Sequence, residues 1–446
     1  MSHYKPYPAF KDSGVEWIGK VPKDWDAKPL KFVASYNDDS LPESHSPNTP
    51  IRYVDISAVS HDVGISCAQP MMFGEAPSRA RRKAKVGDVV VSTVRTYLKA
   101  VAFVDDAHAD CVYSTGFAVL RSRCGKLAPG FLKWLALNEL FVQAVESHSE
   151  GLSYPAINAP DLVNLKAAIP SMPEQIQITD ILNRETARID ALIAKKTRFI
   201  ELLKEKRQAL ITHAVTKGLD PNVKMKDSGV EWIGEMPENW NVVRLKHLVS
   251  CSLQYGANES GSDDIIDAPR YIRITDLNED GELRADGIKR LDPETAKPYM
   301  ISDGDILFAR SGATVGKTYL HRSENDPACF AGYLIKARVA HHKILPKFLI
   351  HSVRSHYYWA YIQQTTIQAT IENVGAERYG DFPVAVPQCE EQEQIIQYLS
   401  VKLTHMDRLS AKTQHSIDLL KERRSALITA AVTGKIDLRN MNAVKE

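Results

Sequence analysis

The sequence predicts an α+β fold made by tandem duplication, in which a globular domain followed by a long helix occurs twice and the two helices pair. Three observations support this: matching segments begin each half, matching segments end each half, and each half closes with a long amphipathic stretch. A chain of 446 residues also exceeds what one hydrophobic core usually fills. The predicted parts are globular domains at 1–168 and 219–385, a first helix at 169–218, and a second helix with a tail at 386–446.

The duplication is most direct at the two ends of each half. Lys11-Asp-Ser-Gly-Val-Glu-Trp-Ile-Gly19 recurs letter for letter as Lys226-Asp-Ser-Gly-Val-Glu-Trp-Ile-Gly234. At the other end, residues 204–216 (KEKRQALITHAVT) pair with residues 421–433 (KERRSALITAAVT) at nearly the same separation. A fainter correspondence lies between them: Gly87-Asp88 with Gly304-Asp305, Gly116-Phe117 with Gly332-Tyr333, and Pro129-Gly-Phe-Leu132 with Pro346-Lys-Phe-Leu349. The chain therefore has constant ends and altered middles.

The repeated leading segments also carry tryptophans, at Trp17, Trp25, Trp232 and Trp240. An aromatic side chain repeated within a constant module indicates either core packing or a surface for a partner. Core packing is the favoured interpretation.

The middle segments, about 31–168 and 246–385, are typical of compact α+β domains. Short β-rich runs at 86–92, 100–104 and 305–309 alternate with turn residues. Shorter helices are expected near 129–146 and 346–363.

Each half ends in a segment that predicts a long helix. Residues 174–216 and 391–433 contain neither proline nor glycine, and apolar residues recur in them at largely heptad spacing. Pro173 with Gly218, and Pro387 with Gly434, bracket the two segments as helix start and stop signals. An isolated helix of this kind would expose its apolar stripe, so the two must pair. The expected seam residues are Leu182, Ile189, Leu192, Phe199, Leu203 and Leu210 in the first helix and Leu399, Met406, Leu409, Leu420 and Leu427 in the second.

Composition excludes several classes of protein. The first thirty residues contain no apolar core for a signal peptide, and no run approaches the roughly 20 apolar residues that span a bilayer, so a cytoplasmic protein without membrane contact is expected. The six cysteines are scattered without a Cys-x-x-Cys pair, and the histidines include one adjacent pair, His341-His342. This pattern predicts neither a disulfide framework nor a metal site.

No motif in the chain predicts catalysis. Residues 310–318 (RSGATVGKT) resemble a phosphate-binding loop, but Ser311 stands where the first glycine belongs. A turn between two strands on a DNA-facing surface is preferred. Neither the Asn-Pro-Pro-Tyr stretch of adenine methyltransferases nor a Gly-x-Ser-x-Gly nucleophile elbow is present.

A local concentration of positive charge points to nucleic acid, although the net charge of the chain is only +1. Seven cations and one acid, Asp88, lie between Arg79 and Lys99. Such a cluster can neutralise phosphates while arginine and polar side chains read base edges, but it can also be a solvated face. In the second half, cations and acids are interspersed, and the polar run 363–370 fits either a base-reading loop or a packed helix end. The candidate DNA-binding residues are Arg79, Arg81, Arg82, Lys83, Arg95, Tyr97, Lys99 and Tyr154 in the first half and Arg270, Arg273, Arg310, Ser311, Thr314, Lys317, Gln364, Gln368 and Arg378 in the second.

Four kinds of motif, each occurring twice and in the same order, resemble those of the specificity subunits of type I restriction–modification systems. They are the Gly-x-x-Pro-x-x-Trp segments (19–25 and 234–240), the Gly-Asp-hydrophobic strands (87–91 and 304–308), the Pro…Glu-Gln helix starts (170–175 and 387–392), and the Lys-x-x-Arg-x-Ala-Leu-Ile-Thr helix ends. One departure lies in the first half, where residues 92–99 (STVRTYLK) stand in place of the Arg-x-Gly…Gly-Lys-like turn that is frequent in the family.

The resemblance implies a non-catalytic subunit in which each globular domain reads one half of a split site on double-stranded DNA. It implies that the helices form an antiparallel coiled coil that fixes the distance between the half-sites. It also implies docking of two methyltransferase subunits and, through them, of restriction subunits. Those partners, not this chain, would hold S-adenosylmethionine, ATP and Mg²⁺. Because the two middles differ, the target should be bipartite and non-palindromic. A stand-alone DNA-binding regulator and a coiled-coil scaffold without a DNA role remain as alternatives.

Overall fold

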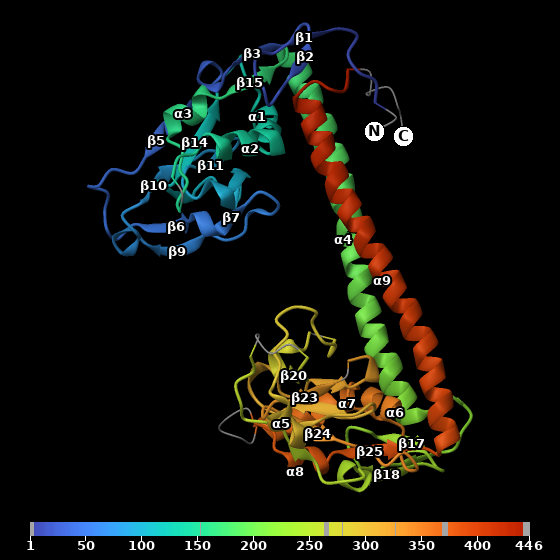
Figure 1. The fold of residues 1–446 in the computed structure, drawn as a ribbon. Helices are drawn as coiled ribbons and strands as arrows, with labels where there is room; N and C mark the ends of the chain where they lie inside the picture. Colours follow the sequence, from blue (N-terminus) through green and yellow to red (C-terminus); the bar gives the residue numbers. More distant parts are fainter. Residues whose placement is uncertain are drawn as a thin grey trace. The chain divides into compact units, whose positions relative to one another are not determined.

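The computed structural model describes residues 4–151, 153–262, 267–278, 280–325, 327–367 and 373–439. The chain divides into two compact units, and each holds one globular domain with half of each long helix, α4 (Met172–Lys217) and α9 (Cys389–Val432) (Figure 1). Unit 1 comprises residues 1–196 and 415–446, and unit 2 comprises residues 197–414. From the sequence, the two long helices were predicted as segments separate from the globular domains. In the structure each helix half is grouped with the globular domain on which it packs.

The globular domain of unit 1 is built on two small sheets. Its strands are β1 Phe10–Asp12, β2 Lys20–Pro22, β3 Asp26–Pro29, β4 Ala34–Tyr36, β5 Asp39–Ser40, β6 Pro50–Val54, β7 Val59–Ser60, β8 Gly64–Ile65, β9 Gln69–Met72, β10 Ala80–Lys83, β11 Val89–Ser92, β12 Val101–Phe103, β13 Val112–Ser114, β14 Phe117–Ser122 and β15 Lys166–Ile169. The first sheet has the order β5-β10-β13-β6-β9 and contains a parallel pair, β13 with β6. The second is antiparallel, in the order β12-β11-β14-β4.

Within its described residues, unit 2 repeats this plan with fewer strands in the first sheet. Its strands are β16 Met225–Asp227, β17 Glu235–Pro237, β18 Asn241–Arg244, β19 Gln254–Tyr255, β20 Arg270–Ile272, β21 Ile306–Ala309, β22 Thr318–Leu320, β23 Ala328–Phe330, β24 Leu334–Ala337 and β25 Pro383–Val386. The four-stranded sheet β22-β21-β24-β19 has the order of its counterpart in unit 1, and β20 with β23 forms the equivalent parallel pair. The predicted duplication and α+β class are confirmed.

Short helices cover the sheets and connect them to the long helices. They are α1 Pro129–Ala136, α2 Glu139–Ser147 and α3 Ala159–Asn164 in unit 1, and α5 Pro293–Ala296, α6 Pro346–Ser352, α7 His356–Ile367 and α8 Ala376–Gly380 in unit 2. Both α1 and α6 begin with proline, which suits the first position of a helix because no backbone N–H is needed there. The short helices expected near 129–146 and 346–363 are therefore confirmed.

The repeated Gly-Asp dipeptide has a structural role in each unit. Gly87 and Gly304 adopt positive φ values of 94° and 85°, and a Cβ on either would stand 3.2 or 3.0 Å from the proline that begins α1 or α6. A side chain would therefore be both strained and crowded at this turn. The following carboxylates are buried against arginines on or just after the neighbouring strand: Asp88 with Arg121 at 2.7 Å and Asp305 with Arg338 at 2.6 Å.

The repeated glutamine at the start of each long helix joins that helix to the globular domain. The amide of Gln175 accepts from the backbone N–H of Ala128 at 2.7 Å and donates to the Pro170 carbonyl. Gln392 makes the same pair of bonds, with Leu345 at 2.8 Å and with Pro387. A buried amide with all these bonds satisfied fixes the direction in which the helix leaves the domain.

The tryptophans of the leading segments pack in or against the core of each unit, as the favoured interpretation predicted. Trp25 and Trp240 are buried, next to the glycines that end α9 and α4, Gly434 and Gly218. The indole N–H of Trp240 donates to Glu391 at 3.0 Å, so it holds the end of one long helix beside the start of the other.

The long helices pair in antiparallel fashion within each unit (Figure 1). In unit 1, Gln177 near the start of α4 donates to the carbonyl of Arg439 beyond the end of α9, and farther along α4 Asp190 lies 2.9 Å from Arg424. In unit 2, Arg207 pairs with Asp407. Residues later in α4 thus lie beside residues earlier in α9.

The seam differs from the expected one at two positions of α4. Leu182, Ile189, Leu399, Met406 and Leu427 are buried, and Leu203, Leu210, Leu409 and Leu420 are half-buried. Leu192 and Phe199, however, are 43% exposed, so their assignment to the seam is wrong. After Ile189 the next seam residues are Ile193, four residues on, and Ile200, seven residues farther, and both are half-buried. A step of three residues from Ile189 reaches Leu192, which lies on the neighbouring face of the helix.

Among the described helices, none is both long enough and apolar enough to cross a membrane.

Candidate nucleic-acid interface

Each unit carries a loop with two left-handed residues at one end of its four-stranded sheet. Residues 93–100 join β11 to β12 in unit 1, and residues 310–317 join β21 to β22 in unit 2. We call them loop 1 and loop 2. Each is bridged by backbone pairing to a segment far along the chain, Val94 with Ala156 and Ser311 with Asn373. The structure therefore holds each loop against another segment of its unit rather than leaving it as a free hairpin end.

The two loops place left-handed residues at equivalent positions. Aligning the two Gly-Asp dipeptides puts Arg95 on Gly312 and Lys99 on Gly316. Their φ values are 52° and 50° in loop 1 and 66° and 86° in loop 2. The first half thus keeps the two left-handed positions of the glycine-containing turn, with two cationic side chains in place of the glycines.

Loop 1 presents an arginine stacked on a tyrosine. The guanidinium of Arg95 lies 5.1 Å from the centre of the Tyr154 ring, and Tyr97 is exposed beside it in sequence. Lys99 is engaged differently, because its ammonium lies 2.6 Å from the Glu139 carboxylate on α2 and this hydrogen bond raises the pKa of the lysine. The buried hydroxyl of Thr96 donates to Ser149 at 2.8 Å and anchors the middle of the loop.

Loop 2 presents a second arginine–tyrosine stack, built from other positions. Arg310 lies 4.8 Å from the ring centre of Tyr255 on β19, and its Nε donates to Asn373 at 3.2 Å. Thr314 donates to the Ser311 carbonyl within the loop, while Lys317 is half-buried where β22 begins. Sequence reasoning missed Tyr255, because it does not lie near Arg310 in the chain and belongs to no motif.

The cations of the predicted basic cluster in unit 1 lie in different surroundings. The guanidinium of Arg79 lies 2.9 Å from the Asp55 carboxylate. The backbone carbonyl of Arg79 accepts from the N–H of Thr115, and the next residue of that turn, Gly116, accepts from Thr93 of loop 1. Arg79 therefore lies at the loop-1 end of β10. Lys83 is exposed at the far end of the same strand.

The two arginines between them differ in environment. Arg81 lies over the Phe73 ring at 4.8 Å. Burial lowers the pKa of Arg82, whose Nε has no hydrogen-bond partner within the described part of the chain.

Other predicted cations of unit 2 are held by the protein itself. Arg273 forms an ion pair with Asp276 at 2.7 Å, and Arg270 donates to the Arg284 carbonyl at 2.7 Å. Gln364 is exposed on α7 and Arg378 on α8, whereas Gln368 lies outside the described residues. Because α7 continues to Ile367, the first part of the polar run 363–370 is a helix end rather than a loop.

The resemblance of residues 310–318 to a phosphate-binding loop has a structural explanation. The segment is a turn between the antiparallel strands β21 and β22, as preferred from the sequence, and Thr318 is buried in β22. A phosphate-binding loop leads into a helix, whose N-terminal N–H groups face the phosphates. Here the chain enters a strand, so this arrangement is missing.

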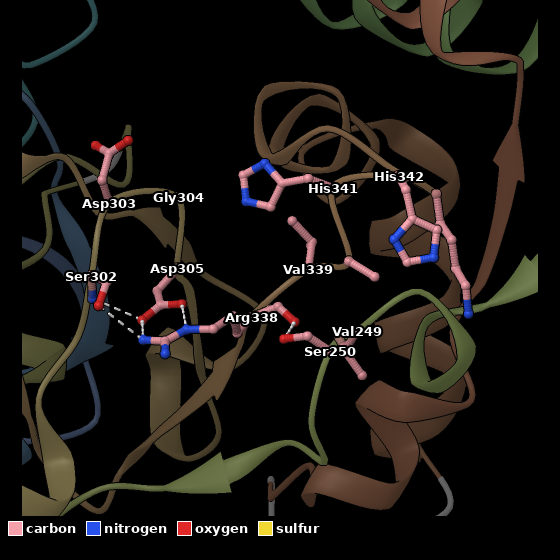
Figure 2. Close-up of a pocket in the computed structure, with 12 residues that line it drawn as sticks. Val249, Ser250, Ser302, Asp303, Gly304, Asp305, Arg338, Val339, His341 and His342 are labelled. Atoms are coloured by element: carbon pink, nitrogen blue, oxygen red, sulfur yellow. Dashed lines mark hydrogen bonds and ion pairs between the residues drawn. The ribbon is translucent and has the colours of Figure 1, made fainter.

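A shallow cavity of about 730 Å³ lies at the opposite end of β21 from loop 2 (Figure 2). Figure 2 shows Arg338 joined to Asp305 and Ser302, with His341 and His342 nearby on the connection after β24. Both histidines are exposed, and within the described residues no group of three or more His, Cys, Asp or Glu side chains could hold a metal ion. The ion pair belongs to the repeated structural framework, so we assign the cavity no role.

Comparison with known proteins gives consistent similarities. Residues 237–418 match the family described as the type I restriction modification DNA specificity domain. The type I restriction enzyme MjaVIII specificity subunit of Methanocaldococcus jannaschii is 24% identical over 314 residues, which cover 69% of this chain and 70% of that protein. The EcoBI specificity subunit of Escherichia coli is 22% identical over 305 residues, covering 66% of this chain and 64% of that protein.

Solved structures with the same fold come from the same kind of system. A chain from a study of complex assembly and conformational transition of the type I restriction–modification system superposes with a TM-score of 0.74 at 22% identity, covering 93% of this chain and 99% of that chain. The HsdS subunit from Thermoanaerobacter tengcongensis gives a TM-score of 0.52 at 22% identity, covering 93% and 98%. At this identity the superpositions establish the fold.

Proposed function

The chain belongs to the family of type I restriction–modification specificity subunits, and on this premise we propose that it reads a bipartite, asymmetric site on double-stranded DNA. At that site it would hold two methyltransferase subunits and, through them, restriction subunits. Its role would be to direct DNA methylation and defence against foreign DNA without performing chemistry. S-adenosylmethionine, ATP and Mg²⁺ would be bound by the partner subunits.

The observation that carries this proposal is the pair of loops. Left-handed residues occur at the same two positions of the loop in both units, and each loop places an arginine over an exposed tyrosine. Arginine is the side chain best suited to reading a base edge, since its planar fork can make two hydrogen bonds to guanine. The stacks come from different loop positions and different partner segments. An asymmetric, two-part target requires two domains that share one framework but present different side chains to the DNA.

Part of the surface of the long helices is suited to a protein partner. In unit 2, Phe199 and Leu202 of α4 are exposed at 43% and 46%, outside the seam with α9. Large apolar side chains exposed close together on one helix mark a surface that another protein can cover. This supports docking of the methyltransferase subunits on the helices.

The proposal predicts that activity appears only on assembly. The purified chain alone should neither methylate nor cut DNA and should not hydrolyse ATP, because it carries no motif for these reactions. Combined with its methyltransferase partners, it should direct methylation to a two-part sequence, which sequencing that detects modified bases would map. Turnover by the isolated chain at full purity would contradict the non-catalytic assignment, and methylation without a two-part site would contradict the reading role.

The strand β10 provides a second test, of binding to DNA phosphates. Replacing Arg81, Arg82 and Lys83 with alanine should weaken DNA binding and flatten its salt dependence by about 0.9 log unit in slope for each phosphate that is no longer neutralised. Fluorescence anisotropy over a salt series measures the slope.

A charge-matched control lies on α4, where Arg184, Arg188 and Lys195 are exposed. Their replacement with alanine removes the same charge from a helix instead of a globular domain and should leave the slope nearly unchanged. Equal slopes for the β10 variant and the parent would show that this strand forms a solvated face away from DNA.

A further inference from the structure

Loop 1 keeps two side chains where the repeated framework uses glycine. Among the described residues, four that are not glycine have a positive φ, and two of them, Arg95 and Lys99, lie in this one loop. A left-handed conformation is unfavourable for any residue with a Cβ, because the Cβ approaches the following carbonyl oxygen. Loop 2 avoids this strain with Gly312 and Gly316. A side chain retained at such a position therefore needs a compensating role.

The two side chains differ in whether the protein itself supplies that role. Lys99 makes an ion pair with Glu139 at 2.6 Å, which fixes α2 against the loop. Arg95 makes no ion pair or side-chain hydrogen bond with any residue that the structure describes. Its contact is the face of Tyr154, and that tyrosine is itself 66% exposed. The fold thus accounts for Lys99 but not for Arg95.

The stack leaves the arginine prepared for an external ligand. An aromatic face orients the plane of a guanidinium by cation–π attraction and stacking but occupies none of the N–H groups along its edge. These donors match the two acceptors, O6 and N7, that guanine presents in the major groove. A strained backbone and a stacked side chain together reduce the number of orientations that the arginine can adopt, which lowers the entropic cost of binding.

We propose that Arg95 is a specificity-determining residue that reads a guanine in the half-site bound by unit 1. This rests on the proposed function, because it requires that unit 1 read DNA. Unit 2 has glycine at the equivalent position, so its arginine, Arg310, enters from another point of its loop and is tied to Asn373. The two units therefore read guanine from different loop positions, and the two half-sites differ for this structural reason.

The test uses the full chain assembled with its methyltransferase partners. Sites methylated by the parent define the two half-sites, and exchange of residues 246–385 identifies which of them belongs to unit 1. In that half-site the parent should prefer one guanine over the other bases by about ten- to hundredfold, the discrimination of a good bidentate pair. Arg95→Ala should reduce the preference at this single position to less than about threefold and leave the other half-site unchanged.

Lys126→Ala is the control, since it removes one exposed positive charge of unit 1 outside loop 1. It should keep the guanine preference. Arg95→Gly separates reading from folding: it should lose the preference with no decrease in the thermal unfolding midpoint, because glycine suits the backbone.

Three outcomes would overturn the proposal. One is a guanine preference that survives in both Arg95→Ala and Arg95→Gly, which would leave the proposed function intact. The second is a lower unfolding midpoint for Arg95→Gly, which would make Arg95 a structural residue. The third is a parent complex that methylates without any two-part site, in which case the proposed function fails first.

Discussion

Exchange of residues 246–385 for the corresponding domain of a related protein is expected to change one half-site completely and leave the other intact. The physical reason is that loop 2, Tyr255 and Asn373 all lie inside the exchanged segment, whereas every residue of loop 1 lies outside it. Methylation-site mapping of the assembled chimera measures the outcome.

The exchange is compatible with the fold because its junctions fall where backbone contacts dominate. The segment begins just after β18 and ends within β25, and these strands pair antiparallel with Val242 opposite Ala385. Ladder bonds between backbones do not depend on side-chain identity, so an incoming strand can restore them. The reciprocal exchange of 31–168 is the matched control and should alter only the other half-site. A chimera in which both halves of the target change together would contradict independent reading by the two units.

The repeated parts of the sequence made much of this architecture predictable. Gln175 and Gln392 form the same buried bonds in both units, and Gly87 and Gly304 make the same crowded turn, so identical letters correspond to identical structure. The long helices were equally visible, because proline and glycine mark their limits and tertiary packing requires an apolar stripe.

The candidate reading surface was predictable only in part. Arg95 and Tyr154 could be named as candidates, but their stacking joins residues from distant parts of the chain, and no local pattern predicts such a contact. The basic cluster stays a prediction: its cations lie in different surroundings, with Arg79 paired to Asp55, Arg81 over Phe73 and Lys83 exposed. Leu192 was wrongly assigned to the seam for a similar reason. Apolar residues stand both three and four residues after Ile189, at Leu192 and Ile193, but only Ile193 lies on the face that contacts α9.

Lengthening the paired helices is expected to change the spacing of the half-sites without changing their sequences. Because α4 and α9 are antiparallel, the insertion must be made in both, with four residues after Lys196 and four after Gln414, where the two units divide. Four residues lengthen a helix by about 6 Å and rotate the part of the helix beyond them by about 40° in the right-handed sense. A base-pair step of B-DNA rises about 3.4 Å and turns about 35° in the same sense. The preferred spacer should therefore grow by one or two base pairs.

Two comparisons decide whether the helices set this spacing. Four residues inserted after Asn222, in the connection between α4 and β16, lengthen the chain equally without lengthening the helices, and they should leave the spacer unchanged. An insertion in α4 alone should lower activity, because it shifts one side of the seam past the other and places polar residues opposite Leu399 and Met406. If the doubly lengthened subunit assembles, methylates, and still prefers the original spacer, then the methyltransferase subunits set the spacing and the helices serve as their docking surface. A spacer longer by one or two base pairs, with both half-sites preserved, requires that the length of the helical pair itself determines where the second half-site is read.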